Sequence, residues 1–442
     1  MTHRAGPRRR LLDYRGAIAL VVANTIGTGV FTTSGFALSD LGSPGFVLLA
    51  WLVGGIYALS GVAIYADLAT RFPQSGGEYA FLRETLHPAL GTAAGWVSLV
   101  AGFTSPIAAA ALGAELYAAR VGGFETGAPW FASALIVMLA ALHAGAPETG
   151  VRFLNGAVAI KVVAILAFIF LGAPHVANAI GVSPAVDGSP FSLLAFGGSL
   201  VWISYAYSGW NAAVYVTGDV EGGGEAVRRA LYSGTALVIV LYLGVSAVIL
   251  YSAPREALAG VADSGAVAAR ALGGVRAEEG LSALIALALA TSASSMLLSG
   301  PRVYAQMARD GALPAILGRL HGEHPRIAII AQAALCIIVV WSASLRELLE
   351  FVGVTLSVSA GAVIVGWLRQ EFLGSTQRVR VFLLGAATVF LAATTGIAVA
   401  AIIMRPGSAI AATILICVGL GAHYVSARLR TNVTSTSGAT SE

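Results

Sequence analysis

The chain has 442 residues, of which 57% are hydrophobic and only 11% are charged, and its mean hydropathy is +0.82. Soluble domains carry about 25% charged residues, so this composition excludes an ordinary soluble protein and predicts a polytopic membrane protein. The formal net charge of +4 is too small to indicate a nucleic-acid partner, and none is expected.

Apolar stretches long enough to cross a bilayer recur along the whole chain. Twelve are expected, at residues 16–38, 44–70, 88–118, 129–146, 153–173, 191–217, 228–252, 281–307, 326–343, 348–368, 380–403 and 408–427. Residues 1–15 are then an N-terminal segment. Residues 428–442, which are rich in serine and threonine, are expected to form a disordered tail.

The arginines alternate between the two sides of the membrane. With twelve spans, nineteen arginines fall on the side of both termini and six on the other side. The positive-inside rule therefore predicts a cell-membrane protein with cytoplasmic N- and C-termini.

Two of the twelve stretches are interrupted at mid-depth. In the first stretch, Gly27 and Gly29 flank Thr28, and glycine weakens a helix and lets the backbone open. In the sixth stretch, Ser208 and Gly209 form a small pair at the same depth. Glycine is also a common packing residue in membrane helices, so each interruption alone has a second explanation. Interruptions five helices apart favour the binding site of a transporter.

These interruptions suit one kind of ligand. The helix that follows the break in the first stretch offers free N–H groups and a positive dipole end to an anion. Free carbonyls before the breaks suit an ammonium group. A carboxylate with an ammonium on the adjacent carbon satisfies both, which describes an α-amino acid.

Lys161 is the only lysine in the chain, and it lies within the apolar stretch 153–173. A charged side chain at the centre of a membrane helix costs roughly 2.5–3.5 kcal/mol, so its retention needs a compensating role. Lysine is also the basic side chain most readily deprotonated when buried, which suits proton coupling. The alternative is a helix-end residue that snorkels to the surface, but Lys161 lies about two turns from Arg152.

Four segments resemble the amino acid–polyamine–organocation transporter superfamily. Residues 26–31 read Ile-Gly-Thr-Gly-Val-Phe, residues 73–79 read Pro-Gln-Ser-Gly-Gly-Glu-Tyr, residues 207–211 read Tyr-Ser-Gly-Trp-Asn, and residues 307–311 read Met-Ala-Arg-Asp-Gly. The resemblance implies an all-α LeuT-like fold with two inverted repeats of five helices, over residues 16–175 and 190–368. Two further helices, over residues 380–427, would be appended.

The resemblance also assigns residues to a substrate site. It implies that the substrate carboxylate is bound by Gly27, Thr28 and Gly29. The amino group would be received by the backbone carbonyls of Thr25, Tyr205, Ala206 and Ser208. Tyr205 would also occupy the position of the aromatic gate.

Lys161 matches the helix 5 lysine found in many relatives of this superfamily, at the place where sodium-coupled relatives hold a sodium ion. Its ammonium would replace that ion and bridge the break in helix 1 to helix 8, near Ser292 or Ser295. We expect no metal or cofactor, and the seven histidines show no metal-binding spacing.

The resemblance implies a secondary active transporter of small or neutral amino acids that works by alternating access, with protons coupled through Lys161. The alternative is a sodium-independent exchanger in which Lys161 only substitutes structurally for sodium. A non-transporting nutrient receptor is a third possibility. Protons and membrane lipid are the expected partners besides the amino acid. Cys336 and Cys417 lie in apolar stretches and not in an external loop, so no disulfide-linked heavy chain is expected.

A neutral substrate is expected because acids are missing from the interrupted stretches. A cationic substrate would need a carboxylate partner. The first stretch has none, and the sixth has Asn211 where an acid could reach the site. Glu115 is the nearest acid, and we expect it near the external end of its helix, wetted or paired with Arg120.

Overall fold

The computed structural model describes residues 12–145, 147–182, 191–320, 325–373 and 380–438. Most of the predicted N-terminal segment and residues 439–442 of the predicted tail lie outside the described residues. The elements in chain order are α1 (Tyr14–Thr25), α2 (Gly29–Leu41), α3 (Pro44–Arg71), α4 (Gly77–Thr85), α5 (Pro88–Val97), η1 (Ser98–Thr104), α6 (Ser105–Gly122), α7 (Trp130–Gly145), α8 (Pro147–Val182), α9 (Leu193–Tyr207), η2 (Ala212–Asp219), α10 (Gly223–Ser252), α11 (Arg255–Leu258), α12 (Ser264–Arg309), η3 (Ala315–Gly318), α13 (Arg326–Ser342), α14 (Leu345–Leu373), α15 (Val381–Met404) and α16 (Pro406–Gly438).

Helices account for nearly all of the described chain, so the predicted all-α class is confirmed. Within the described residues, nine helical segments are long and apolar enough to cross a membrane, and α7 and α13 are shorter apolar helices. Each of the twelve predicted stretches coincides with helix, the sixth with the short pair α9 and η2. The number of spans itself stays a prediction.

The structure departs from the predicted boundaries in three places. The third stretch contains a π-helix, η1, between α5 and α6. Helix α12 begins at Ser264, well before residue 281, and kinks at Gly273 and Gly274. Helix α16 continues to Gly438, beyond the residue at which the disordered tail was expected to begin.

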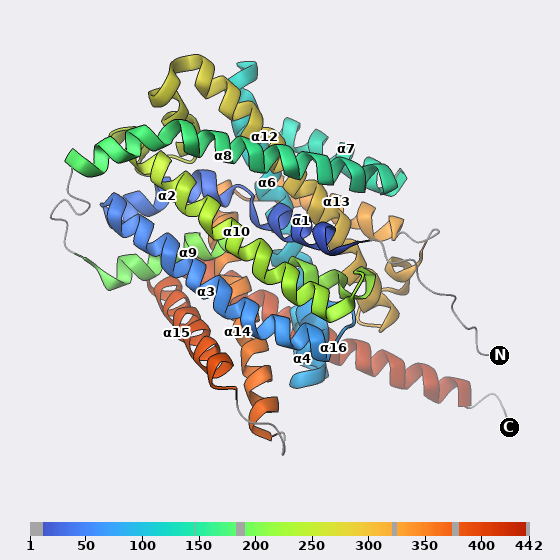
Figure 1. Ribbon diagram of the computed structural model, residues 1–442. Helices are drawn as coiled ribbons and strands as arrows, with labels where there is room; N and C mark the ends of the chain where they lie inside the picture. Colours follow the sequence, from blue (N-terminus) through green and yellow to red (C-terminus); the bar gives the residue numbers. More distant parts are fainter. Residues whose placement is uncertain (1–11, 146, 183–190, 321–324, 374–379, 439–442) are drawn as a thin grey trace.

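The interrupted helices lie inside the bundle and the regular ones surround them. In Figure 1, α7 and α8 lie along the upper side and α15 and α16 along the lower side, with α1, α2 and α9 between them. Large apolar side chains face outward on the peripheral helices, for example Phe170 on α8 at 73% exposure and Phe382 on α15 at 75%. Such an apolar exterior fits contact with lipid and not with water.

The ion pairs reproduce the two arginine sets expected from the topology. Arg120 pairs with Asp263 and Glu278, and Arg405 pairs with Asp40 and Glu350. Both arginines belong to the smaller set. Pairs of the larger set are Arg71–Glu371, Arg83–Asp310, Arg302–Asp219 and Arg380–Asp67. Among the described ion pairs, an acid that contacts two arginines contacts two of the same set: Asp67 pairs with Arg71 and Arg380, Glu278 with Arg120 and Arg270, and Glu350 with Arg346 and Arg405. This separation of the two sets supports two membrane sides.

Candidate substrate site

The break in the first helix is short and leaves the buried start of α2 without a side-chain cap. Helix α1 ends at Thr25 and α2 begins at Gly29, with Thr28 as the N-cap residue. The Thr28 side chain does not cap α2, because its Oγ1 lies 2.7 Å from the Tyr205 hydroxyl. The first N–H groups of an α-helix have no intrahelical acceptor, so the first turn of α2 can receive an anion.

The two breaks lie directly against each other. Gly209 has a φ of +98°, and a Cβ there would lie 2.7 Å from the carbonyl oxygen of Asn24. A Cβ on Gly29 would lie 2.5 Å from the Cβ of Ala206. Only glycine permits these two approaches, and they bring Thr25, Gly29 and Ala206 together. By contrast, a Cβ on Gly27 would meet nothing within 4 Å, so open space lies beside this residue.

A cavity opens beside the second break. Its wall is formed by α9, the break and η2 together with α1, α3, α4, α12, α14 and the segment η1–α6. The lining residues are Asn24, Tyr57, Glu78, Gly102, Phe103, Pro106, Ser204, Ser208, Gly209, Trp210, Asn211, Ala212, Tyr215, Met296, Leu356, Ser357 and Ala360. Of the substrate residues expected from sequence, Ser208 lines this cavity. Thr25, Gly27, Thr28, Gly29, Tyr205 and Ala206 are not among its described lining residues. The π-helix η1 contributes Gly102 and Phe103, in line with the frequent occurrence of π-turns at functional sites.

Lys161 joins the end of α1 to α12. Its side chain is buried, and Nζ donates to the carbonyl oxygen of Ile26 at 2.7 Å and to Ser292 Oγ at 2.9 Å. Ser292 Oγ in turn lies 3.0 Å from the carbonyl oxygen of Ala23. No carboxylate forms an ion pair with Lys161 in the part of the chain that is described. The ammonium therefore interacts with the partial charges of the broken helix, as a bound cation would.

Ser295, the other expected partner of Lys161, lies on the same helix but contacts α1 differently. Its hydroxyl accepts from Asn24 Nδ2 at 2.7 Å, and Asn24 Nδ2 also donates to the carbonyl oxygen of Leu20 at 2.8 Å. Lys161 and Ser295 thus fasten α12 to the end of α1 at two separate points.

The sequence is also similar to those of known proteins. A family model described as amino acid permease matches residues 12–427, which is most of the chain.

The chain belongs to the amino acid permease family.

Its curated relatives include membrane transporters from bacteria and mammals. The permease is 26% identical over 336 residues to the serine/threonine exchanger SteT of Bacillus subtilis, covering 73% of this chain and 74% of that one. It is 26% identical over 347 residues to the branched-chain amino acid permease BcaP of Lactococcus lactis, covering 71% and 72%. The mouse large neutral amino acids transporter small subunit 2 is 24% identical over 368 residues, covering 79% and 68%. The family and these relatives are transporters, so the permease is a multi-pass membrane transporter and not an enzyme.

Tyr242 on α10 contacts both breaks of the permease. Its hydroxyl lies 2.6 Å from the carbonyl oxygen of Thr25 and 2.9 Å from that of Ala206. A phenolic hydroxyl has one hydrogen to donate, so one of these two carbonyls stays available to another donor. Sequence reasoning missed this residue, since a tyrosine in an apolar helix gives no sign of which way it faces.

We expect Tyr242→Phe to weaken substrate binding by up to about tenfold. The change leaves the ring intact but removes the hydroxyl that holds the carbonyls of Thr25 and Ala206 in their present positions. A hydrogen bond contributes about 0.5–1.5 kcal/mol, which is up to about tenfold in affinity. The KM for amino acid uptake measures the effect. Tyr14→Phe is the matched control, since that hydroxyl bonds Ser233 at an exposed position, at the opposite end of α1 from its break. An unchanged KM in Tyr242→Phe would mean that its hydroxyl is not part of the site.

Glu115 occupies a different place from the one expected. Its Oε2 accepts the backbone N–H of Ala132 at 2.8 Å, in the first turn of α7, and its side chain is buried. Arg120, the expected partner, pairs with Asp263 and Glu278 instead. The expectation of a wetted or Arg120-paired Glu115 was therefore wrong, because a helix start offers the carboxylate better-placed donors.

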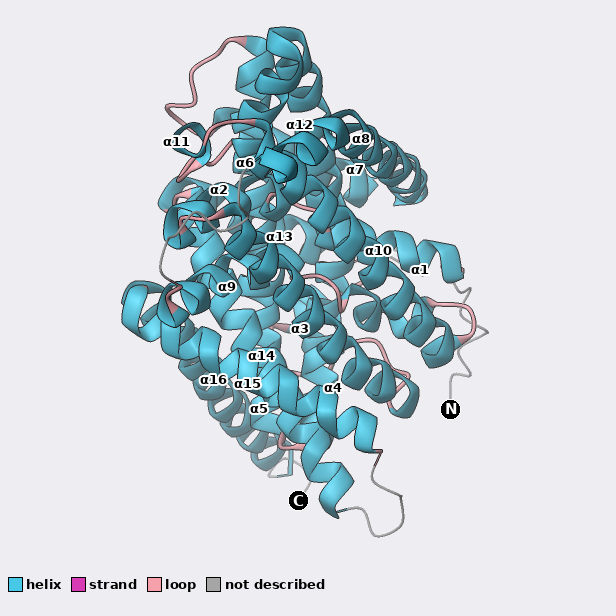
Figure 2. Cartoon of the chain, turned by 60° about the vertical axis from the view of Figure 1, so that its left-hand side comes forward, coloured by secondary structure: helices cyan, strands magenta, loops and turns pink. Residues whose placement is uncertain are grey.

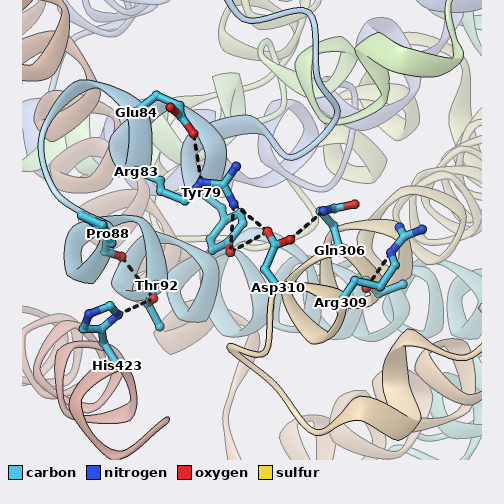
Figure 3. A network of polar contacts seen from close by, with 10 residues as sticks. Tyr79, Arg83, Glu84, Pro88, Thr92, Gln306, Arg309, Asp310 and His423 are labelled. Atoms are coloured by element: carbon cyan, nitrogen blue, oxygen red, sulfur yellow. Dashed lines mark hydrogen bonds and ion pairs between the residues drawn. The ribbon is translucent and has the colours of Figure 1, made fainter. Parts of the chain in front are cut away.

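A network of polar contacts joins α4 to the end of α12 (Figure 3). Asp310 Oδ2 accepts from Arg83 Nη1 at 2.6 Å and from the Tyr79 hydroxyl at 2.8 Å, and Asp310 Oδ1 accepts from Gln306 Nε2 at 3.0 Å. Burial and the Asp310 carboxylate raise the pKa of Tyr79 to about 12. Tyr79 therefore stays protonated as a donor, and the network holds α4 in place.

Proposed function

We propose that the permease carries small or neutral amino acids across the cell membrane by alternating access. The observation that carries this proposal is the direct contact between two broken helices, α1–α2 and α9–η2. It sets the first-turn N–H groups of α2 beside the carbonyls that end α1 and α9. An α-amino acid presents an anion that suits these N–H groups and a cation that suits these carbonyls.

In this proposal, Gly27, Thr28 and Gly29 bind the substrate carboxylate, and the open space beside Gly27 receives it. Carbonyls near the breaks receive the ammonium, namely those of Thr25, Tyr205, Ala206 and Ser208. Tyr205 gates the site. Its hydroxyl is hydrogen-bonded to Thr28, so a movement of α9 displaces the start of α2.

We also propose that Lys161 couples transport to protons. Protonated, Nζ carries the positive charge that binds the end of α1 to Ser292 on α12. Deprotonated, it binds more weakly, so the Asn24–Ser295 hydrogen bond alone joins the end of α1 to α12 and the two helices separate more readily. Because the substrate shifts this equilibrium only through different affinities for the two states, proton and substrate must favour the same one. Both chain termini lie in the cytoplasm in this scheme.

The name of one relative supports a second candidate function. SteT is named a serine/threonine exchanger, and an exchanger with Lys161 as a structural substitute for sodium would have the same contacts. A nutrient receptor on the same scaffold would bind an amino acid without moving it.

Uptake by purified protein in liposomes distinguishes these candidates. We expect radiolabelled alanine, serine or leucine to accumulate in empty liposomes when an inward proton gradient is imposed, and to equilibrate without one. Uptake confined to liposomes preloaded with amino acid would identify an exchanger. Saturable binding with no uptake in either assay would identify a receptor, and neither binding nor uptake of any amino acid would contradict the proposed substrate class.

A further inference from the structure

Glu78 is a buried carboxylate in the wall of the cavity. It stands in the first turn of α4, between the membrane-spanning segments Pro44–Arg71 and Pro88–Gly122, and its residue exposure is 1%. Gly77 before it has a φ of +54°, and a Cβ there would collide with the ring of Tyr215. This glycine lets η2 lie against the start of α4. Glu78 is the one carboxylate among the described residues that line the cavity.

The carboxylate joins three elements. Oε1 accepts from the Tyr65 hydroxyl and from Asn211 Nδ2, both at 2.9 Å, and Oε2 accepts from the Tyr215 hydroxyl at 2.6 Å. Tyr65 lies on α3, while Asn211 and Tyr215 lie just after the break between α9 and η2. Glu78, Asn211 and Tyr215 together form the cavity floor. The floor holds η2 in its present position against α3 and α4.

All of these partners are neutral. Tyr65 and Tyr215 are the titratable groups in hydrogen-bonding contact with Glu78, and no described ion pair includes Glu78. Charged or titratable groups on the elements packed around α4 have other partners: Asp67 with Arg71 and Arg380, Glu371 with Arg71, Arg369 with the carbonyl of Thr85, His87 with the N–H of Ala89, and Asp310 with Arg83. Ionising a buried carboxyl group that has no cation nearby costs much free energy, so the protonated form of Glu78 is favoured.

We propose that Glu78 is a proton-binding residue of the transport cycle. Protonated on Oε2, Glu78 donates to the Tyr215 hydroxyl at 2.6 Å while Oε1 still accepts from Tyr65 and Asn211, and the cavity floor stays closed. When η2 moves away and water enters from the cytoplasm, the carboxyl O–H bond breaks, the proton passes to water, and the carboxylate remains solvated. The proposal rests on the proposed function, because it assumes that the floor opens during amino acid transport. It adds a second proton site to the one proposed at Lys161.

The sign of the pH dependence follows from burial. Burial raises the pKa of the Glu78 carboxyl in the closed structure, against hydrogen bonds from neighbouring side chains that lower it. With the floor open, water returns that pKa toward its ordinary value. Between the two values the closed form holds more protons, so low pH favours the closed floor and rising pH favours opening.

Glu78→Gln tests the proposal in liposomes, because glutamine keeps the shape and neutrality of the protonated acid but has no proton to release. We expect this variant to retain exchange of alanine in preloaded liposomes and to lose the stimulation of net uptake by an inward proton gradient. Glu84→Gln is the matched control on the same helix; its carboxylate is exposed and pairs with Arg83 (Figure 3), so it should behave like the unmodified protein.

A second measurement reports opening without any substrate. Both native cysteines are replaced by alanine, Ala360 in the cavity wall is replaced by cysteine, and a membrane-impermeant maleimide is applied from the cytoplasmic side. A cysteine in place of Glu84 serves as the exposed reference thiol. As pH rises, we expect the Ala360→Cys rate to increase relative to the reference by up to about tenfold per pH unit, the limit for one proton. With Glu78→Gln added, this relative rate should rise less steeply with pH, because the proton of Glu78 no longer contributes.

The outcomes separate the two proposals. Gradient-stimulated uptake that persists in Glu78→Gln, or the same pH dependence of alkylation with and without that change, would overturn the role of Glu78. Amino acid exchange without any effect of protons on the unmodified protein would also overturn it, while leaving amino acid transport intact. If the unmodified protein moved no amino acid, the proposed function would fail, and pH-dependent alkylation would still show whether Glu78 controls the floor. If Glu78→Gln failed to fold, an Ala360→Cys rate that rose no faster with pH than the reference thiol would decide against the proposal.

Discussion

Replacement of Lys161 by alanine is expected to abolish net amino acid uptake. The change removes the Nζ donor to the carbonyl oxygen of Ile26 and to Ser292 Oγ, which together fasten the end of α1 to α12. Hydrogen bonds to charged groups contribute about 1.5–3 kcal/mol, and each 1.4 kcal/mol is a factor of about ten. The state in which α1 is joined to α12 should therefore lose roughly 10- to 150-fold in population. Net uptake into liposomes and exchange into preloaded liposomes measure the result.

The two assays also decide what Lys161 does. Retained exchange without proton-driven uptake identifies a coupling residue, whereas equal loss of both identifies a structural substitute for a cation. Ile160→Ala is the matched control on the same helix, because that side chain is 52% exposed on the outer face. Uptake that still responded to pH in Lys161→Ala would contradict a coupling role.

Gly29→Ala is expected to lower the apparent Tm and to eliminate transport. The added methyl group would meet the backbone and side chain of Ala206, so the two broken helices would have to move apart. Overpacking of this kind costs about 1–3 kcal/mol, and here it also displaces the first turn of α2 from the carbonyls that end α9. Thermal unfolding of the purified protein and uptake into liposomes give the two readouts.

Gly27→Ala is the natural comparison two residues away. A Cβ at this position would meet nothing within 4 Å, so folding should be unaffected and the apparent Tm should match that of the unmodified protein. The methyl group would occupy the space proposed for the substrate carboxylate, and KM should rise. A Gly29→Ala protein with normal stability and normal uptake would show that the two breaks do not need to touch.

Most of the helices could be predicted from hydropathy alone, because a bilayer-crossing helix needs a long apolar stretch wherever it lies. The early start of α12 could not. Its first turns carry charged residues such as Arg270, Arg276 and Glu278, which lower the local hydropathy, and the pairing of Glu278 with Arg120 and Arg270 depends on the tertiary structure. The π-helix η1 was equally hidden, since its sequence differs little from that of an ordinary apolar helix.

The candidate site was predictable where it depends on the backbone. Glycines around Thr28 and the pair Ser208–Gly209 identify positions where helices are interrupted, and the structure interrupts them there. Side chains that reach the breaks from other helices were not predictable, because their contacts depend on helix rotation. Tyr242 reads as a packing aromatic in the sequence, and Glu78 reads as part of a loop motif. Their roles become visible only from the groups they contact: the carbonyls of the two breaks for Tyr242, and neutral hydrogen-bond donors for Glu78.

The solitary amine of Lys161 has a practical consequence for watching this protein move. Reductive methylation with isotopically labelled formaldehyde acts on amines, and along the side chains of this sequence it has a single target. That target sits at the junction of α1, α8 and α12, shielded in the present conformation. The rate of its modification measures how often the junction opens. After modification, the NMR signal of the single dimethyl-lysine reports its surroundings, and no other lysine signal overlaps it.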